Sequence, residues 1–108
     1  MAAEAAVARR YQAMGYHVMA ERWRGPHGEI DLILEDDDGA LVFVEVKCAK
    51  HLDQALSSLG RRQQQRLLDS ATVFLGLMPQ GLRTACRIDL AACDGTGAMH
   101  IVENALAA

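Results

Sequence analysis

Two short patterns in the sequence contain the side chains best suited to chemistry. In the run from Leu41 to Lys47, Glu45 and Lys47 are two residues apart, so on a strand they point to the same face. An earlier run carries Glu29 and Asp31 on the polar side of an alternating pattern. Carboxylates and an amine held together on rigid backbone can bind a cation and act on a phosphate.

The connection between the two runs predicts how these groups meet. A three-residue loop, Asp37-Asp38-Gly39, would put its glycine in the left-handed position of a bulged hairpin turn. In that register Asp31 lies opposite Glu45, with Cβ atoms roughly 4.5–5.5 Å apart. The same register sets Glu29 opposite Lys47. A loop shorter by one residue would mix polar and apolar faces, so the longer loop is favoured.

Two opposed carboxylates repel each other unless a proton or a cation sits between them. A divalent ion resolves this conflict, because Mg²⁺ (or Mn²⁺) takes carboxylate oxygens and keeps positions open for water and phosphate. Lys47 beside such an ion would stabilise a pentacovalent phosphate or orient the attacking water. A solvated hairpin face with an ordinary Glu–Lys neighbour would carry the same residues, and the pattern alone leaves both interpretations open.

The charge of the chain is unevenly distributed. Its 108 residues carry a formal net charge of -3, with 51% hydrophobic and 23% charged residues, which predicts one globular domain over residues 1–108. Seven of the 14 acidic residues lie between Glu29 and Glu45, where there is no Lys or Arg, so the rest carries +4. A metal ion would offset the local acidity and leave the positive remainder to meet phosphate.

The cysteines and the absence of long apolar runs indicate the compartment. The three cysteines, Cys48, Cys86 and Cys93, are odd in number and form no C-x-x-C motif, so neither a disulfide framework nor a zinc site is predicted. Cys48 is expected to face the core. The first residues lack the apolar centre of a signal peptide, and no apolar run approaches the roughly 18–20 residues that span a bilayer. We expect a cytoplasmic protein without membrane contact.

The elements that must position these groups follow from periodicity and turn signals. In chain order we expect a helix over about residues 4–14, strands over 16–24, 29–35 and 41–47, a helix over 61–78, and strands over 83–91 and 99–103. This order, αβββαββ, predicts an α/β protein with a mixed sheet flanked by helices. In the second strand Ile30, Leu32 and Leu34 are expected in the core, with Ile33 on the polar face.

The second long helix adds further candidates. Its apolar stripe is formed by Leu67, Leu68, Ala71, Phe74, Leu75 and Met78. Gln63 and Gln64 lie at the edge and near the centre of that stripe, and either could face the sheet. The candidate phosphate-contacting residues are Arg24, Lys50, Arg61, Arg62 and Arg66. A solvated helix face would explain the same basic residues.

The hexapeptide Gly28-Glu29-Ile30-Asp31-Leu32-Ile33, followed by Val42-Phe43-Val44-Glu45-Val46-Lys47, resembles the YraN family of small bacterial proteins. That family is grouped with nucleases of the restriction-endonuclease-like fold, notably archaeal Holliday-junction resolvases. The superfamily signature is an Asp, then Glu-x-Lys one strand later. The similarity runs from Glu4 to His100-Ile101 and Asn104-Ala105, and Gln63 stands where the family usually has a lysine.

The resemblance implies a restriction-endonuclease-like fold and a metal-dependent nuclease acting on DNA, with branched or damaged DNA as the candidate substrate. Asp31 and Glu45 would bind Mg²⁺ or Mn²⁺, and Lys47 would assist. Glu4 or Glu29 would complete the site, and nucleases of this type often add a glutamine from a helix. A nucleic-acid-binding module without turnover, an accessory subunit and a protein–protein adaptor are the alternatives. A homodimer would bring two sites to one branched substrate.

Overall fold

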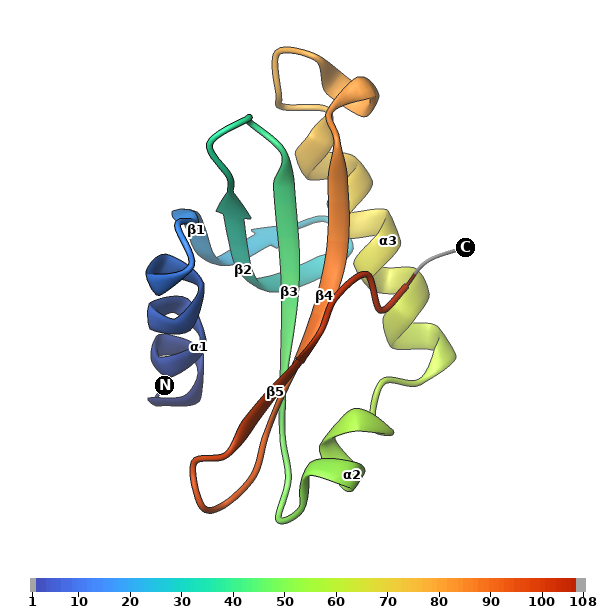
Figure 1. Ribbon diagram of the computed structural model, residues 1–108. Helices are drawn as coiled ribbons and strands as arrows, with labels where there is room; N and C mark the ends of the chain where they lie inside the picture. Colours follow the sequence, from blue (N-terminus) through green and yellow to red (C-terminus); the bar gives the residue numbers. More distant parts are fainter. Residues whose placement is uncertain (1, 107–108) are drawn as a thin grey trace.

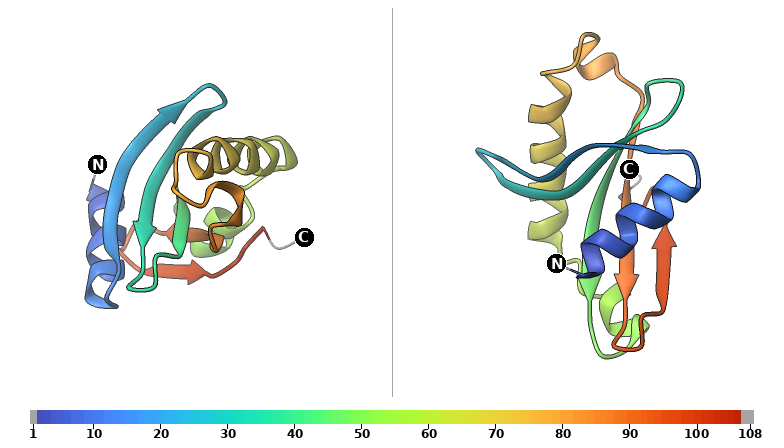
Figure 2. Two further views of the ribbon diagram at one scale, coloured as in Figure 1. Left: turned by 90° about the horizontal axis from the view of Figure 1, so that it is seen from above. Right: turned by 90° about the vertical axis from the view of Figure 1, so that its left-hand side faces the viewer.

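A five-stranded sheet lies between two helices in the computed structural model (Figure 1). The structure describes residues 2–106, so residue 1 and residues 107–108 of the predicted domain lie outside it. Helix α1 (Ala2–Ala13) covers one face of the sheet and helix α3 (Arg61–Leu75) covers the other, as the two turned views show (Figure 2). Both faces of the central strands are therefore buried.

The strands lie in the sheet in the order in which they occur in the chain. They are β1 (His17–Gly25), β2 (Gly28–Glu35), β3 (Leu41–Cys48), β4 (Cys86–Cys93) and β5 (Met99–Val102). Strands β3 and β4 are parallel, and every other neighbouring pair is antiparallel. The connection between the parallel strands contains α3 and two short helices, α2 (Leu52–Leu56) and η1 (Gly81–Arg83). The predicted order αβββαββ is confirmed, with these two short helices added.

The β2–β3 hairpin has the predicted register. Its backbone pairs run from Leu32–Val44 to Glu35–Leu41. The loop closes with a hydrogen bond of 2.9 Å from the Asp36 N–H to the Ala40 carbonyl. Gly39 has φ +85°, the left-handed conformation that a three-residue loop of this kind requires. The hairpin therefore turns as the sequence predicts.

The burial of β2 differs from its sequence pattern. Ile33 is fully buried with Phe43 and Phe74, although alternation assigned it to a polar face. The reason is that α3 covers the face of β2 that the alternating pattern predicted to be polar. Ile30 is buried in the core as predicted, but it packs in this same cluster, whereas Leu32 and Leu34 pack in the cluster on the opposite face. The prediction of a polar environment for Ile33 was wrong.

Three smaller expectations are also corrected. Helix α3 ends at Leu75, three residues before the predicted end, and Gly76 follows it. Leu68 is 41% exposed and does not belong to the buried stripe of that helix. Cys48, the last residue of β3, is exposed and does not lie in the core as expected.

A buried polar network joins α1 to β4 and to the residues after β5. The Asp89 carboxylate is fully buried and accepts hydrogen bonds from the Tyr11 hydroxyl (2.7 Å), the Arg87 Nε (2.9 Å) and the Asn104 N–H (2.9 Å). Arg87 also donates to the Tyr16 hydroxyl at 3.0 Å. These contacts assign Asp89 the structural role expected of a buried, fully partnered carboxylate.

Within residues 2–106, no helix is both long enough and apolar enough to cross a membrane.

Candidate functional site

Asp31 and Glu45 meet where the pairing of β2 with β3 ends. The last backbone pair on this side is Leu32–Val44, and the strands diverge beyond it. There the Asp31 Oδ2, and not a backbone carbonyl of β2, accepts a hydrogen bond of 2.8 Å from the Val46 N–H. This bond fixes the Asp31 carboxylate against the strand segment that carries Glu45. The predicted neighbourhood of the two carboxylates is thus present in the structure.

Glu45 is buried beneath helix α3 and paired on one oxygen. Its side chain is 6% exposed, and its Oε2 lies 3.3 Å from Lys47 Nζ and 3.8 Å from Arg66 Nη2. Its Oε1 is buried and has no hydrogen-bond partner among the described residues. Burial and the neighbouring Asp31 carboxylate raise the pKa of Glu45, Lys47 lowers it, and the resulting pKa is about 7. Near neutral pH the Glu45 carboxyl group is therefore partly protonated when no cation is bound.

These oxygen atoms are suited to a hard divalent ion. Glu45 Oε1 and Gln63 Oε1 are both buried without a partner in the part of the chain that the structure describes. No group of three His, Cys, Asp or Glu side chains that could hold a metal occurs in residues 2–106. Mg²⁺ commonly binds proteins through one or two carboxylates and takes its other ligands from water and substrate phosphates. Asp31 and Glu45 fit that mode of binding and do not form a complete protein cage.

The other predicted acidic ligands are held by arginines. Arg22 Nε donates to Glu4 Oε1 at 3.1 Å, and Arg24 Nη2 lies 3.2 Å from Glu29 Oε2. The hydrogen bond to Glu4 raises the pKa of Arg22, and the charges of Glu29 and Asp31 raise it further. Both glutamates therefore lie near the Asp31 end of the site, but each is paired with a cation. The predicted pairing of Glu29 with Lys47 lies outside the backbone pairs of the hairpin.

The two glutamines of helix α3 have different surroundings. Gln64 donates from Nε2 to the Leu59 carbonyl at 3.0 Å, so its amide closes the turn before the helix. Gln63 lies one helical turn before Arg66, and its buried Oε1 has no hydrogen-bond partner within residues 2–106. Of the two alternatives left open by the sequence, Gln63 is the one whose buried acceptor lacks a partner in this described part of the chain.

Arg66 is the candidate phosphate-contacting residue that reaches the buried Glu45. Besides contacting Glu45, its Nη1 donates to the Glu29 carbonyl at 3.0 Å. A side chain at position 28 would come within 2.9 Å of Arg66 Nη1, and Gly28 has φ +123°, so only glycine permits this approach.

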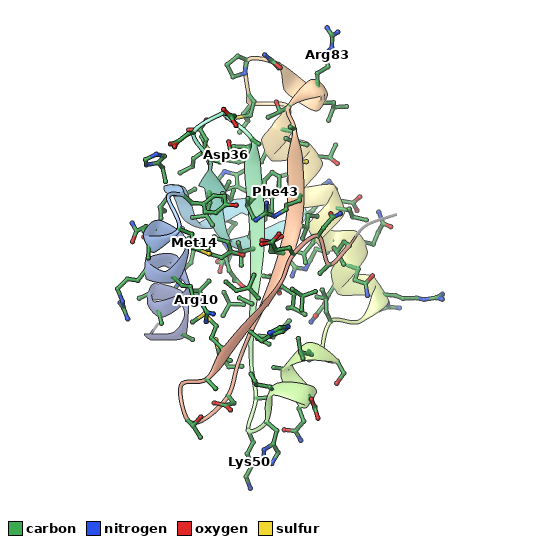
Figure 3. All side chains as sticks on the ribbon, viewed as in Figure 1. Arg10, Met14, Asp36, Phe43, Lys50 and Arg83 are labelled. Atoms are coloured by element: carbon green, nitrogen blue, oxygen red, sulfur yellow. The ribbon has the colours of Figure 1, made fainter. Side chains whose placement is uncertain are left out.

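The remaining basic candidates are exposed. They are Arg24, Lys50, Arg61 and Arg62. Arg61 and Arg62 open helix α3, on the same helix as Arg66. Lys50 follows the end of β3 and points away from the molecule, opposite the hairpin turn at Asp36 (Figure 3).

The part played by Arg22 could not be predicted from the sequence. It adopts φ +50°, a conformation unusual for a residue other than glycine, at the position of β1 that faces Asp31 across the pairing. Glycine or asparagine would have signalled such a backbone, and an arginine does not. Its partner Glu4 lies on another element, so their contact depends on tertiary structure.

The chain is similar to proteins of an uncharacterised family and to a solved endonuclease structure. The model of the uncharacterised protein family UPF0102, the YraN family, matches residues 3–93. A UPF0102 protein of Ruegeria pomeroyi is 50% identical over 104 residues, covering 96% of this chain and 84% of that protein. A UPF0102 protein of Cereibacter sphaeroides is 47% identical over 106 residues, covering 98% and 90%.

A solved structure gives the fold. The crystal structure of a repair endonuclease from Pyrococcus abyssi superimposes with a TM-score of 0.54 and 23% sequence identity. The match covers 86% of this chain and 37% of that enzyme, so the chain spans little more than a third of its length. The mixed sheet with a helix on each face is thus the restriction-endonuclease-like core that the sequence predicts.

Proposed function

We infer that this chain, which belongs to the uncharacterised protein family UPF0102, is a metal-dependent nuclease that hydrolyses phosphodiester bonds in DNA. The observation that carries the inference is the meeting of Asp31 and Glu45 beside Lys47. One oxygen of each carboxylate is engaged by the protein, by the Val46 N–H in Asp31 and by Lys47 and Arg66 in Glu45. A pair in which a buried Glu45 faces the half-buried Asp31 costs stability, and a cationic ligand would offset that cost.

The donor atoms favour Mg²⁺ or Mn²⁺ as that ligand. Asp31 and Glu45 would hold the ion, with Gln63 Oε1 as an additional oxygen near the buried face of α3. Such an ion, when bound, polarises a phosphoryl oxygen and lowers the pKa of a coordinated water.

Lys47 and Arg66 supply positive charge from the protein itself. The Lys47 ammonium is paired with Glu45, and the Lys47 side chain is 21% exposed. This side chain therefore still reaches the surface, where a phosphate would approach. In that position it stabilises charge that develops on the phosphate and orients an attacking water. Arg66 holds Glu45 and the backbone at Glu29, so its role is to position the site.

Two further facts support DNA as the substrate. The structure from Pyrococcus abyssi is that of a repair endonuclease, and this chain shares its core fold. Exposed arginines at the start of α3 lie on the helix that also reaches the carboxylates, and phosphate binding draws on such charge. Branched or damaged DNA is the substrate class that we propose.

The direct test is cleavage of end-labelled branched, flapped, single-stranded and duplex DNA in Mg²⁺ or Mn²⁺, with matched RNA strands beside them. We expect cleavage of DNA by the wild type and a loss of at least about 100-fold in Asp31→Asn and Glu45→Gln. Lys47→Met should lower the rate and leave metal binding largely intact.

Asp38→Asn is the matched control, because Asp38 is an exposed carboxylate in the same acidic segment, at the turn of the hairpin. It should cleave like the wild type. Absence of cleavage by the wild type with every substrate and both metals would overturn the proposal, as would equal cleavage by Asp31→Asn.

Binding of nucleic acid without turnover is a second candidate function. The observation that favours it is the pairing of Glu4 with Arg22 and of Glu29 with Arg24, which leaves two carboxylates for a metal in the described residues. In that case DNA binding would be sensitive to salt, unchanged in Asp31→Asn, and not followed by cleavage with any metal.

A homodimer belongs to the same proposal, since cutting two strands of a branched substrate benefits from two sites. Sedimentation equilibrium with and without a DNA junction measures it directly. A mass that stays that of one chain in both conditions would contradict a dimer.

A further inference from the structure

Two cysteines that are far apart in the sequence lie side by side at one end of the sheet. Cys48 ends β3 and Cys93 ends β4, and the parallel pairing of these strands sets the two residues directly opposite each other. Neighbouring strands are about 4.8 Å apart, and disulfides join Cα atoms roughly 4.4–6.8 Å apart. Residues paired in this way point to the same face of the sheet, here the face covered by α1. The backbone thus already satisfies the distance that a disulfide needs.

The surroundings of the two thiols differ in a way suited to stepwise oxidation. Cys48 is exposed and Cys93 is buried. Both cysteines line a cavity of about 420 Å³ together with Ala3, Ala6 and Arg9 of α1. A molecule as small as a peroxide can enter this cavity. Burial raises the pKa of the Cys93 thiol, and the adjacent Cys48 raises it further.

We propose that Cys48 and Cys93 form a peroxide-sensitive dithiol that closes reversibly to a disulfide. The Cys48 thiolate attacks a peroxide, the O–O bond breaks, and Cys48 becomes a sulfenic acid while the peroxide is reduced to an alcohol or water. The Cys93 sulfur then attacks the Cys48 sulfur, the S–S bond forms, and hydroxide leaves with the Cys93 proton as water. Two equivalents of a small thiol reverse the reaction by exchange.

Closure would tie together the ends of two strands next to the carboxylate site. Cys48 directly follows Lys47, and the bridge would join this strand end to the start of the turn that begins at Asp94. The proposal concerns the thiols alone and does not depend on nuclease activity.

The test uses the full chain, reduced and freed of reductant, then exposed to hydrogen peroxide under native conditions. Trypsin separates the three cysteines, because cleavage after Lys and Arg places them in residues 48–50, 84–87 and 88–108. We expect the intact protein to lose the mass of two hydrogens. We also expect peptide 48–50 to be linked to peptide 88–108, and dithiothreitol to restore both.

Cys86→Ser is the matched control, because Cys86 is an exposed cysteine at the opposite end of β4. It should form the bridge at the wild-type rate. Cys48→Ser and Cys93→Ser should each form no bridge within the chain, and in Cys93→Ser the sulfenic acid should remain for a dimedone probe to capture. A bridge that includes Cys86, or peroxide treatment that leaves all three thiols reactive to a maleimide without mass loss, would overturn the proposal.

Discussion

Asp31 and Glu45 are oriented before any ligand arrives. The Val46 N–H holds Asp31, and Lys47 with Arg66 holds Glu45, so neither carboxylate is free to turn away from the other. Groups held in this way cost little further ordering when they bind an ion or a substrate. The cost is electrostatic, because burial beside the Asp31 carboxylate disfavours the charged form of Glu45.

This electrostatic cost predicts how the free energy of unfolding depends on pH when no metal is bound. The pKa of Glu45 rises on folding from its ordinary value of 4.5 to about 7, so the folded state binds the proton more tightly. The stabilisation is present in full below the ordinary pKa and is lost as pH rises through the folded one. With allowance for solvent screening, we expect the metal-free protein to lose about 2 kcal/mol of unfolding free energy between about pH 5 and pH 8.

Urea unfolding of the wild type and of Glu45→Gln at a series of pH values measures this loss. Glu45→Gln lacks the titrating group, so the difference between the two proteins isolates its contribution. Mg²⁺ should restore stability to the wild type above pH 7 and not to the variant. Parallel pH profiles of the two proteins would contradict the prediction.

Arg22 is a second residue whose charge acts on the site. Its guanidinium pairs with Glu4 and lies near the charges of Glu29 and Asp31, where it competes with a metal ion for them. Arg22→Asn removes the charge and suits the left-handed backbone. We expect it to lower the Kd for Mn²⁺ about fivefold.

Isothermal titration calorimetry with Mn²⁺ provides the measurement. Arg22→Lys retains the charge at the same backbone position and should keep the wild-type Kd. If Arg22→Asn bound Mn²⁺ no more tightly than Arg22→Lys, the competition would be absent.

Among the elements, the register of the β2–β3 hairpin could be predicted from the sequence. The contacts that neighbouring elements make with this hairpin could not. The loop length and Gly39 determine the register locally, so the meeting of Asp31 with Glu45 follows from a short segment. The burial of Ile33 depends on α3, which lies more than 25 residues further along the chain. A single strand pattern shows which residues are apolar and not which element covers each face.

The pairing of Glu4 with Arg22 could not be predicted for the same reason. It joins α1 to β1 through an irregular backbone position, and neither periodicity nor turn chemistry reports that placement. The basic candidates were identified by residue type alone, and only the fold distinguishes the half-buried Arg66 from the outlying Lys50.

Helix α3 gives a prediction of its own. Arg61 and Arg62 are exposed at its first turn, while Arg66 faces the carboxylates. If the first two contact phosphates, their joint replacement by alanine should weaken DNA binding and lower the slope of log K against log salt by about 2.

Fluorescence anisotropy with labelled DNA at several salt concentrations gives that slope. Arg83→Ala is the control, because Arg83 is exposed in η1, beyond the other end of α3 (Figure 3). A slope that changes equally in both variants would exclude a specific role for the start of the helix.

For the molecule as a whole, the Asp89 network connects helix α1, strand β4 and the segment after β5, which are far apart in the sequence. Asp89 receives hydrogen bonds from α1, from its own strand and from the segment after β5. We expect Asp89→Ala to cost about 3–5 kcal/mol, because Arg87 is left partly buried without its partner. Tyr11→Phe removes one hydrogen bond and should cost about 1–2 kcal/mol.

Urea unfolding followed by far-ultraviolet circular dichroism measures both variants. Tyr11→Phe remains informative if Asp89→Ala fails to fold. Losses below about 0.5 kcal/mol in Tyr11→Phe would show that the buried hydroxyl contributes little.

The same contact has a consequence for synthesis on the ribosome. Tyr11 and Asp89 are 78 residues apart, and at about 5–20 residues per second the ribosome needs about 4–16 s to add that length. Throughout that interval the hydroxyl of Tyr11 has no native acceptor. Helix α1 is therefore made first, yet it can take its final place only when the fourth strand has been translated.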